Sequence, residues 1–271
     1  MNVEIRPLAA LAECQEAYRL QVEIWGAEQS VPSNQIVVAM RIGGLALGAF
    51  APDGAMSGFS LAVPALQSGA PYLWSDILAV RADWRGRGLG RRLKWAQREH
   101  ALRLGFQRIC WTYDPLQAVN AQLNIGTLGG TSRTYLPNLY GEMHDGLNGG
   151  LPTDRLLVDW SLDSPAVTRL AAGAAPPSIR AAALPTATQV EAGPLPRLVD
   201  VNLDLTAPAL LCAIPSGFAA VRQADPGEAL RWRSGVRQAL VHYFDRGYAI
   251  TGITAAGPGL IAYRLTTGIE G

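Results

Sequence analysis

The sequence has few cysteines and few histidines, and neither type is grouped. Three of each occur, and both sets are widely spread. The cysteines therefore form neither a zinc-type spacing nor a disulfide framework, and no His-x-x-x-His pair is present, so we expect no metal centre. We expect buried free thiols in a reducing compartment. The residues concerned are Cys14, Cys110, Cys212, His100, His144 and His242.

Excess charge and long apolar runs are also absent. The formal net charge is only +1, which gives no general reason to bind nucleic acid or a membrane surface. No apolar run reaches the length of about 18 residues that a membrane-spanning helix needs. The first residues lack the basic region and apolar run of a secretory signal. We therefore expect a soluble, cytoplasmic protein whose partners include neither nucleic acid nor a membrane.

Apolar residues are plentiful, at 49% of the 271 residues, so the chain can bury a substantial core. Hydrophobic periodicity predicts alternating strands and helices up to Leu162. The strands are expected at 2–6, 45–50, 56–63, 72–81, 106–113, 131–140 and 155–162, and the helices at 8–25, 35–41, 88–104 and 116–128. This order predicts the α/β (α+β) class, with helices on the faces of a mixed sheet.

Composition changes after Leu162. Residues 164–196 are rich in Ala and Pro, and we interpret them as a linker with a helical turn near 166–172. Residues 197–271 regain order and form a small C-terminal α/β extension. About 70 residues bury little core, so we expect the extension to dock on the first domain, residues 1–163. Its strands are expected at 199–205, 209–214, 248–253 and 260–265, and its helix at 226–246.

The most informative stretch is a glycine loop between the predicted strand 72–81 and the helix that follows. It reads Arg85-Gly86-Arg87-Gly88-Leu89-Gly90, with Arg91 and Arg92 directly after it. Such a loop presents unpaired N–H groups at a helix N-terminus, where the helix dipole adds positive charge. Guanidinium groups match phosphate oxygens. The loop therefore predicts a phosphate site.

Two other interpretations of the loop remain open. A Rossmann dinucleotide site would use Asp114 as its ribose-binding acid. The spacing G-x-G-x-G, the crowded arginines and the preceding hairpin argue against it. The second alternative is a glycine turn with a purely structural purpose.

The loop also matches the R/Q-x-x-G-x-G/A signature of the GNAT superfamily of acyl-CoA N-acyltransferases. The order of strand, loop, helix, strand and helix around it is similar to that family. The resemblance covers about residues 1–162, and the segment from Trp111 to Arg155 looks like a largely uncharacterised subgroup. The resemblance implies a mixed, mostly antiparallel sheet flanked by helices, with acetyl-CoA or another acyl-CoA as co-substrate.

The same resemblance implies where coenzyme A binds. The pantetheine arm would lie on the splayed end of the strand before the loop, at Ala79 and Val80. Asn120 would contact the pantetheine or its pocket. The pyrophosphate would bind to the loop and the start of the helix, at Arg85, Gly86, Arg87, Gly88, Leu89, Gly90 and Arg91.

Acyl transfer to an amine needs a base for the amine, stabilisation of an oxyanion and an acid for the leaving thiolate. Members of the family often carry a carboxylate base on the strand before the loop, a role that falls to Asp76. The usual acid is a Tyr on the helix after the next strand, and this chain lacks it. We therefore consider Tyr135, Tyr140 and His144 as candidates, the last in a polar glycine-rich loop.

The predicted function is direct transfer of an acyl group, in the first place from acetyl-CoA, to an unidentified amine. A small-molecule amine is favoured over a protein acceptor. The missing Tyr suggests two alternatives: a module that binds acyl-CoA without turnover, or other thioester chemistry such as malonyl-CoA decarboxylation. The C-terminal extension has three open roles, namely completing a homodimer, covering the acceptor cleft or extending the sheet.

Overall fold

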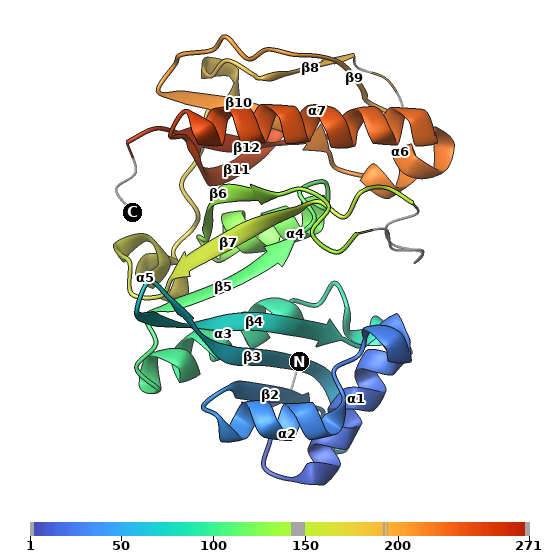
Figure 1. The fold of residues 1–271 in the computed structure, drawn as a ribbon, viewed down its shortest axis with the longest axis vertical. Helices are drawn as coiled ribbons and strands as arrows, with labels where there is room; N and C mark the ends of the chain where they lie inside the picture. Colours follow the sequence, from blue (N-terminus) through green and yellow to red (C-terminus); the bar gives the residue numbers. More distant parts are fainter. Residues whose placement is uncertain (1–2, 142–149, 192, 194, 269–271) are drawn as a thin grey trace. The chain divides into compact units, whose positions relative to one another are not determined.

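A computed structural model describes residues 3–141, 150–191, 193 and 195–268 (Figure 1). The chain divides into two compact units, each built from two separate stretches. Unit 1 comprises Met1–Trp111 and Trp160–Ala171, and unit 2 comprises Thr112–Asp159 and Ala172–Gly271. These boundaries differ from the predicted division into 1–163, 164–196 and 197–271, which stays a prediction about domains.

Unit 1 contains a sheet in the order β1-β2-β3-β4-β5. Neighbouring strands from β1 to β4 run antiparallel, and β5 pairs with β4 in parallel. This arrangement excludes the Rossmann alternative, whose sheet is mostly parallel. The strands are β1 (Glu4–Pro7), β2 (Leu45–Phe50), β3 (Met56–Gln67), β4 (Ala70–Val80) and β5 (Arg108–Tyr113), of which the last two residues belong to unit 2.

Helices cover both faces of this sheet. On one face, α1 and α2 bury Leu20 and Ile36 against Phe59 of β3. On the other face, Leu89 and Leu93 of α3 lie against Gly58, the neighbour of Phe59 on β3. The helical elements are α1 (Leu11–Trp25), η1 (Ala27–Gln29), α2 (Ser33–Arg41), η2 (Ala82–Trp84), α3 (Leu89–Arg103) and α5 (Pro165–Ala171).

Strand β4 carries a β-bulge at Asp76. Ser75 pairs with Ala62 and Ile77 with Leu61, so Asp76 is one residue more than β3 has. The bulge changes which face the later side chains occupy. Ser75 meets α3, whereas Ile77 packs in the core under α1 and α2.

Pairing between β4 and β5 ends at the same place. The register joins Leu73 to Ile109 and Trp74 to Cys110, and no further pair is described between these strands in residues 3–111. From Ser75 onward, β4 therefore has one paired edge, on β3, and one open edge. We call the point after Trp74 and Cys110 the fork.

Unit 2 contains a second run of strands in the order β7-β6-β11-β12-β10. The described pairs among them are antiparallel. The strands are β6 (Thr131–Leu136), β7 (Arg155–Ser161), β10 (Ala209–Pro215), β11 (Ala249–Gly257) and β12 (Leu260–Thr266), and β8 (Thr188–Glu191) pairs with β9 (Arg197–Val201) separately. The last two residues of β7 belong to unit 1. The helical elements are α4 (Ala118–Ala121), η3 (Gln122–Thr127), η4 (Ala181–Ala183), α6 (Phe218–Ala224) and α7 (Pro226–Asp245).

Several predicted elements differ from the structure. The helix expected at 116–128 is a short α-helix, α4, followed by a π-helical segment, η3. Gly126 lets η3 pack tightly, because a Cβ there would lie 2.8 Å from the Ile253 side chain of β11. The strand expected to reach Tyr140 ends at Leu136. Regular structure also occupies parts of the predicted linker, in α5, η4 and β8.

The predicted class is confirmed: the structure is a mixed α/β fold whose strands are mostly antiparallel and flanked by helices. Across the described residues, no helix combines the length and the apolar character that crossing a membrane requires.

Candidate functional site

The glycine loop connects β4 to α3 as predicted, with the short helix η2 between. Gly86 has φ 72° and Gly88, the N-cap of α3, has φ 78°. Both angles lie in the left-handed region that glycine adopts without strain. Gly90 differs, because a Cβ there would meet only Leu78 and Val80 at an ordinary 3.8 Å. Gly86 and Gly88 therefore shape the turn, and position 90 has room for alanine.

The loop presents a row of unused N–H groups. Among the described residues, no acceptor takes the main-chain N–H groups of residues 86–91. The first main-chain bond at this end of α3 runs from the N–H of Arg92 to the carbonyl of Gly88, at 3.1 Å. The positive end of the dipole of this 15-residue helix lies at the same place. Unused N–H groups at the positive end of a helix are an arrangement that suits an anion, and we call residues 86–91 the cradle.

The arginines around the cradle fall into two groups. Arg85 donates from Nε to the carbonyl of Val80 at 3.0 Å, and Arg92 donates to the carbonyl of Val3 at 2.7 Å. Arg81 forms ion pairs with α1. In the described part of the chain, Arg87 and Arg91 have no such partner, and both are exposed. These two guanidinium groups are the ones free to meet a bound phosphate.

The open edge of β4 leads directly into this cradle. Val80 ends the strand, and Ala79 is buried in the core under α1 and α2. Any ligand on this edge therefore meets the backbone of Ala79 rather than its side chain. An extended, amide-bearing chain pairs well with such an edge, as an added strand does. The contacts predicted for Ala79 and Val80 fit this geometry and stay predictions.

Asp76 lies at the bulge and is the second residue of β4 beyond the fork. Its carboxyl is exposed, yet the protein around it removes enough hydration to raise its pKa, against a side-chain hydrogen bond with Trp74 that lowers it. A raised pKa makes a carboxylate a stronger base. The geometry is therefore compatible with the predicted base, although no contact with an amine tests it.

Tyr135 is committed to an interaction inside unit 2. Its hydroxyl donates to Oδ2 of Asp154 at 2.6 Å, and Asp154 is fully buried. Burial and the neighbouring Asp154 carboxylate raise the pKa of Tyr135. Its phenol thus serves a buried network, and a catalytic role for it stays a prediction.

The other candidates in unit 2 are less constrained. Tyr140 is 53% exposed, and its hydroxyl lies 3.4 Å from Oγ1 of Thr112. The guanidinium of Arg155 lies 5.2 Å from the centroid of its ring. Asn120 is exposed on α4. His144 lies outside the described residues.

The structure thus brings the coenzyme A candidates of unit 1 together on β4, the loop and the start of α3. It also shows a residue that the sequence interpretation missed. Lys94 lies on the buried face of α3, with Gln97 and Ala101. A signal was present, because the spacing from 94 to 97 to 101 is that of one helix face and includes an apolar residue.

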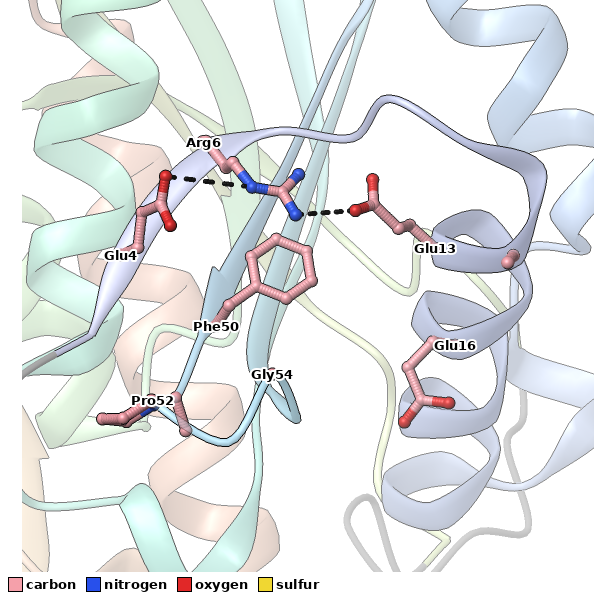
Figure 2. A pocket seen from close by; sticks show the side chains of 9 residues that line it. Glu4, Arg6, Glu13, Glu16, Phe50, Pro52 and Gly54 are labelled. Carbon is pink, nitrogen blue, oxygen red and sulfur yellow. Dashed lines mark hydrogen bonds and ion pairs between the residues drawn. The ribbon is translucent and has the colours of Figure 1, made fainter.

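A pocket of about 570 Å³ lies elsewhere on unit 1, between β1, α1 and the turn after β2 (Figure 2). Arg6 lies over the ring of Phe50 at 4.0 Å and pairs with Glu13 at 2.7 Å. None of the predicted site residues lines it. Its carboxylates disfavour an anionic ligand such as coenzyme A. The lining residues are Glu4, Arg6, Ala12, Glu13, Glu16, Phe50, Ala51, Pro52 and Gly54. In the part of the chain that the structure describes, no group of His, Cys, Asp and Glu suits a metal ion.

Comparisons with known proteins add evidence about the fold. No protein-family model and no curated protein matches the sequence. Solved structures do match. A candidate acetyltransferase from Acinetobacter baylyi is 15% identical, with a TM-score of 0.50 over 60% of this chain and 94% of its own.

Two further structures are similar at somewhat lower TM-scores. The ribosomal-protein-S18-alanine N-acetyltransferase from Escherichia coli is 18% identical, with a TM-score of 0.49 over 60% of this chain and 96% of its own. A candidate acetyltransferase from Salmonella typhimurium, solved with acetyl-CoA, is 19% identical, with a TM-score of 0.49 over 66% of this chain and 100% of its own. At these identities the likeness concerns the fold alone, and the mixed, mostly antiparallel sheet flanked by helices agrees with the fold that the resemblance implied.

Proposed function

We propose that the protein is an acyl-CoA-dependent N-acyltransferase that uses acetyl-CoA and transfers the acyl group directly to an amine. One observation carries the proposal: the unused N–H groups of residues 86–91 directly follow a strand whose edge is open from Ser75 onward. The first feature suits a diphosphate and the second suits an extended chain of amides. Coenzyme A has both parts in this order.

The donor half of the site lies in unit 1. The cradle of residues 86–91 would hold the pyrophosphate, with Arg87 and Arg91 adding charge. The backbone of Ala79 and Val80 would hold the pantetheine arm. A contact of Asn120 with the pantetheine or its pocket stays a prediction. The bound thioester supplies the activated acyl group. The Salmonella typhimurium structure, solved with acetyl-CoA, supports this choice of co-substrate.

The acceptor half depends on fewer features. Asp76 would take a proton from the amine, since its pKa is raised and it stands at the bulge beside the open edge. Among the described acid candidates we favour Tyr140, because its hydroxyl is accessible, whereas that of Tyr135 is bonded to Asp154. His144 remains a candidate outside the described residues.

The acceptor we propose is a small-molecule amine rather than a protein, since the net charge of +1 gives no field for a strongly charged partner. We propose the cytoplasm as its location, where buried free thiols such as Cys14, Cys110 and Cys212 stay reduced. A homodimer is the remaining prediction about partners, and sedimentation of the purified protein tests it.

Isothermal titration with coenzyme A tests the donor half. Arg91→Ala is expected to weaken binding about tenfold, because it removes one charge-assisted contact to phosphate. Arg103→Ala is the matched control, since it removes an exposed cation from the far end of the same helix. Binding of a nicotinamide dinucleotide in place of coenzyme A would contradict the proposal.

Turnover is tested by thiol release from acetyl-CoA over a panel of amines. Asp76→Asn is expected to lower kcat at least about a hundredfold, the usual contribution of a general base. The rate of the unaltered protein is expected to fall as the pH drops through the raised pKa of Asp76. Tight binding without turnover on any amine would favour the binding module, and release of carbon dioxide from malonyl-CoA would favour decarboxylation.

A further inference from the structure

Unit 1 contains a buried cation that the proposed function does not use. Lys94 of α3 is 2% exposed, and no carboxylate pairs with it among the described residues. Its Nζ donates to Oγ of Ser75 at 3.0 Å and to Oε1 of Gln97 at 2.9 Å. It also lies 3.5 Å from the ring centroid of Trp111 and 5.7 Å from that of Trp160. An ammonium has three donors, and the two oxygens and the near ring face accept all three.

This arrangement satisfies the hydrogen bonds of Lys94 and leaves its charge uncompensated. Burial removes the hydration of the ammonium and lowers the pKa of Lys94 well below its usual value. A buried charge without a counter-charge costs stability. Ser75 and Gln97 do not need it, because the Ser75 hydroxyl already donates to Oε1 of Gln97 at 3.1 Å. A methionine would fill the same space without that cost, so packing does not account for Lys94.

The position of Lys94 suggests what it does. Ser75 is the last residue of β4 before the bulge at Asp76, and Trp111 directly follows Cys110, the last residue of β5 paired with β4. Lys94 therefore contacts both strands at the fork, from the side of α3. The contact joins the strands where their own backbone pairing has ended.

We propose that Lys94 is a positioning residue of the acyl-transfer site: by bonding Ser75 on β4 and resting on Trp111 of β5, its ammonium sets how far the fork opens and where Asp76 stands. The proposal rests on the proposed function. Lys94 contacts neither the loop nor the expected pantetheine edge, so it acts through Ser75 and the bulge. Its uncompensated charge also favours negative charge that develops at the fork.

The first test uses a readout that needs no acceptor. [1-13C]Acetyl-CoA is bound to the full chain, and the stretching frequency of its thioester carbonyl is measured. In Lys94→Met we expect this frequency to move toward that of free acetyl-CoA, while coenzyme A still binds within about twofold because the N–H cradle is intact. Arg103→Met removes an exposed cation from the same helix and is expected to change neither the carbonyl frequency nor the affinity for coenzyme A.

The second test separates positioning from folding. With an amine that supports turnover, Lys94→Met is expected to lower kcat at least about tenfold with little change in KM for acetyl-CoA, because a misplaced reacting group slows the chemical step. Its melting temperature is expected to equal or exceed that of the unaltered protein. Ser75→Ala removes the bond from Lys94 to β4, together with the bond from Ser75 to Gln97, and is expected to act in the same direction. Ser75→Thr retains the hydroxyl and is expected to restore activity.

The pH profile adds a third readout. The groups that face Lys94 are Ser75 from β4, Gln97 from α3 and the rings of Trp111 and Trp160, and none of these titrates near neutral pH. The rate is therefore expected to fall as the pH rises through the lowered pKa of Lys94, and this fall is expected to be absent in Lys94→Met.

The results distinguish the two proposals. If the unaltered protein does not bind coenzyme A, both fail. If the unaltered protein binds coenzyme A and catalyses acyl transfer, the proposed function holds. The Lys94 proposal then fails under either of two results. One is that Lys94→Met and Ser75→Ala keep kcat and the carbonyl frequency. The other is that both variants lose activity only in proportion to lost stability, which would show a purely structural cation.

Discussion

The two units differ in whether a carboxylate pairs with the buried cation. In unit 2, Arg233 of α7 is buried and forms two hydrogen bonds with Asp114, at 2.7 and 2.8 Å. In unit 1, Lys94 is equally buried and has no carboxylate among its described contacts. A paired cation is explained by the contact that it makes. An unpaired one costs stability, and it is therefore the better guide to function.

The paired cations of unit 2 fasten the C-terminal segment. Arg237, one turn after Arg233, donates to both oxygens of Asp154, at 2.9 and 2.6 Å. Nearby, Tyr263 of β12 donates to the carbonyl of Pro115 at 2.7 Å. These contacts join residues after 196 to the stretch 112–159. The segment predicted as an extension thus contributes to the same compact unit as the end of the predicted first domain.

The arginines of the glycine loop and those of α7 differ in the same way. Arg87 and Arg91 of unit 1 have no partner in the described residues and flank the unused N–H groups of the loop. The arginines of α7 already have their carboxylates. The loop therefore holds positive charge available to a ligand, whereas the arginines of α7 form ion pairs within unit 2.

Breaking a paired cation is expected to have the largest effect. Arg233→Met is expected to destabilise the protein by about 3 kcal/mol, because Asp114 is left largely buried without its counter-charge. Urea unfolding measures the loss. The control is the double variant Arg233→Met with Asp114→Asn, which is expected to recover part of the lost free energy of unfolding because the buried carboxylate is removed as well. Equal stabilities for Arg233→Met and the unaltered protein would remove the distinction between the units.

Changing the loop is expected to affect binding and stability together. Gly88→Ala is expected to cost about 1–2 kcal/mol, since φ is 78° at this position and a Cβ is strained there. The affinity for coenzyme A is expected to fall as well, because the N–H groups of the loop shift. Calorimetry measures this affinity. Gly90→Ala is the matched control with room for its methyl, and a similar loss there would contradict this account.

Acid is expected to weaken the ion pair between Arg237 and Asp154 in unit 2. Burial acts to raise the pKa of Asp154, but hydrogen bonds from Arg237 and Tyr135 outweigh it and lower the pKa below its usual value. This carboxylate therefore contributes stability above its unfolded pKa and loses it as the pH falls through the lower, folded value. The slope for one such proton is at most about 1.4 kcal/mol per pH unit. Unfolding between pH 6 and pH 3 (roughly the range of carboxyl titration) measures it, and Arg237→Gln is expected to flatten the slope.

Removing the unpaired cation is expected to change the free energy of unfolding least. It is expected to raise that free energy, whereas the changes above lower it. Lys94→Met is expected to stabilise the protein by about 1 kcal/mol, because a buried charge without a partner disappears and the Ser75–Gln97 bond remains. Urea unfolding at neutral pH measures the gain. A loss as large as that of Arg233→Met would place Lys94 among the structural cations.

The outcome for individual elements shows what local patterns can predict. Helix α3 was expected at 88–104 and spans Leu89–Arg103, because its glycine start and its apolar stripe are local signals. The π-helix η3 was not predicted, since its hydrogen-bond pattern leaves no mark in side-chain periodicity. Helix α6 was not predicted either. The helical turn expected near 166–172 appears as α5.

The sequence by itself determined the glycine loop, the helix that follows it and the fold class, because left-handed turns, helix starts and strand periodicity depend on neighbouring residues. Only the tertiary structure decided that Asp76 occupies a bulge, that Lys94 lies unpaired at the fork and that Asp114 and Asp154 meet arginines more than 80 residues away. Each of these depends on the register between strands or on contacts between distant segments. Such contacts form when the core closes, and no local pattern specifies them.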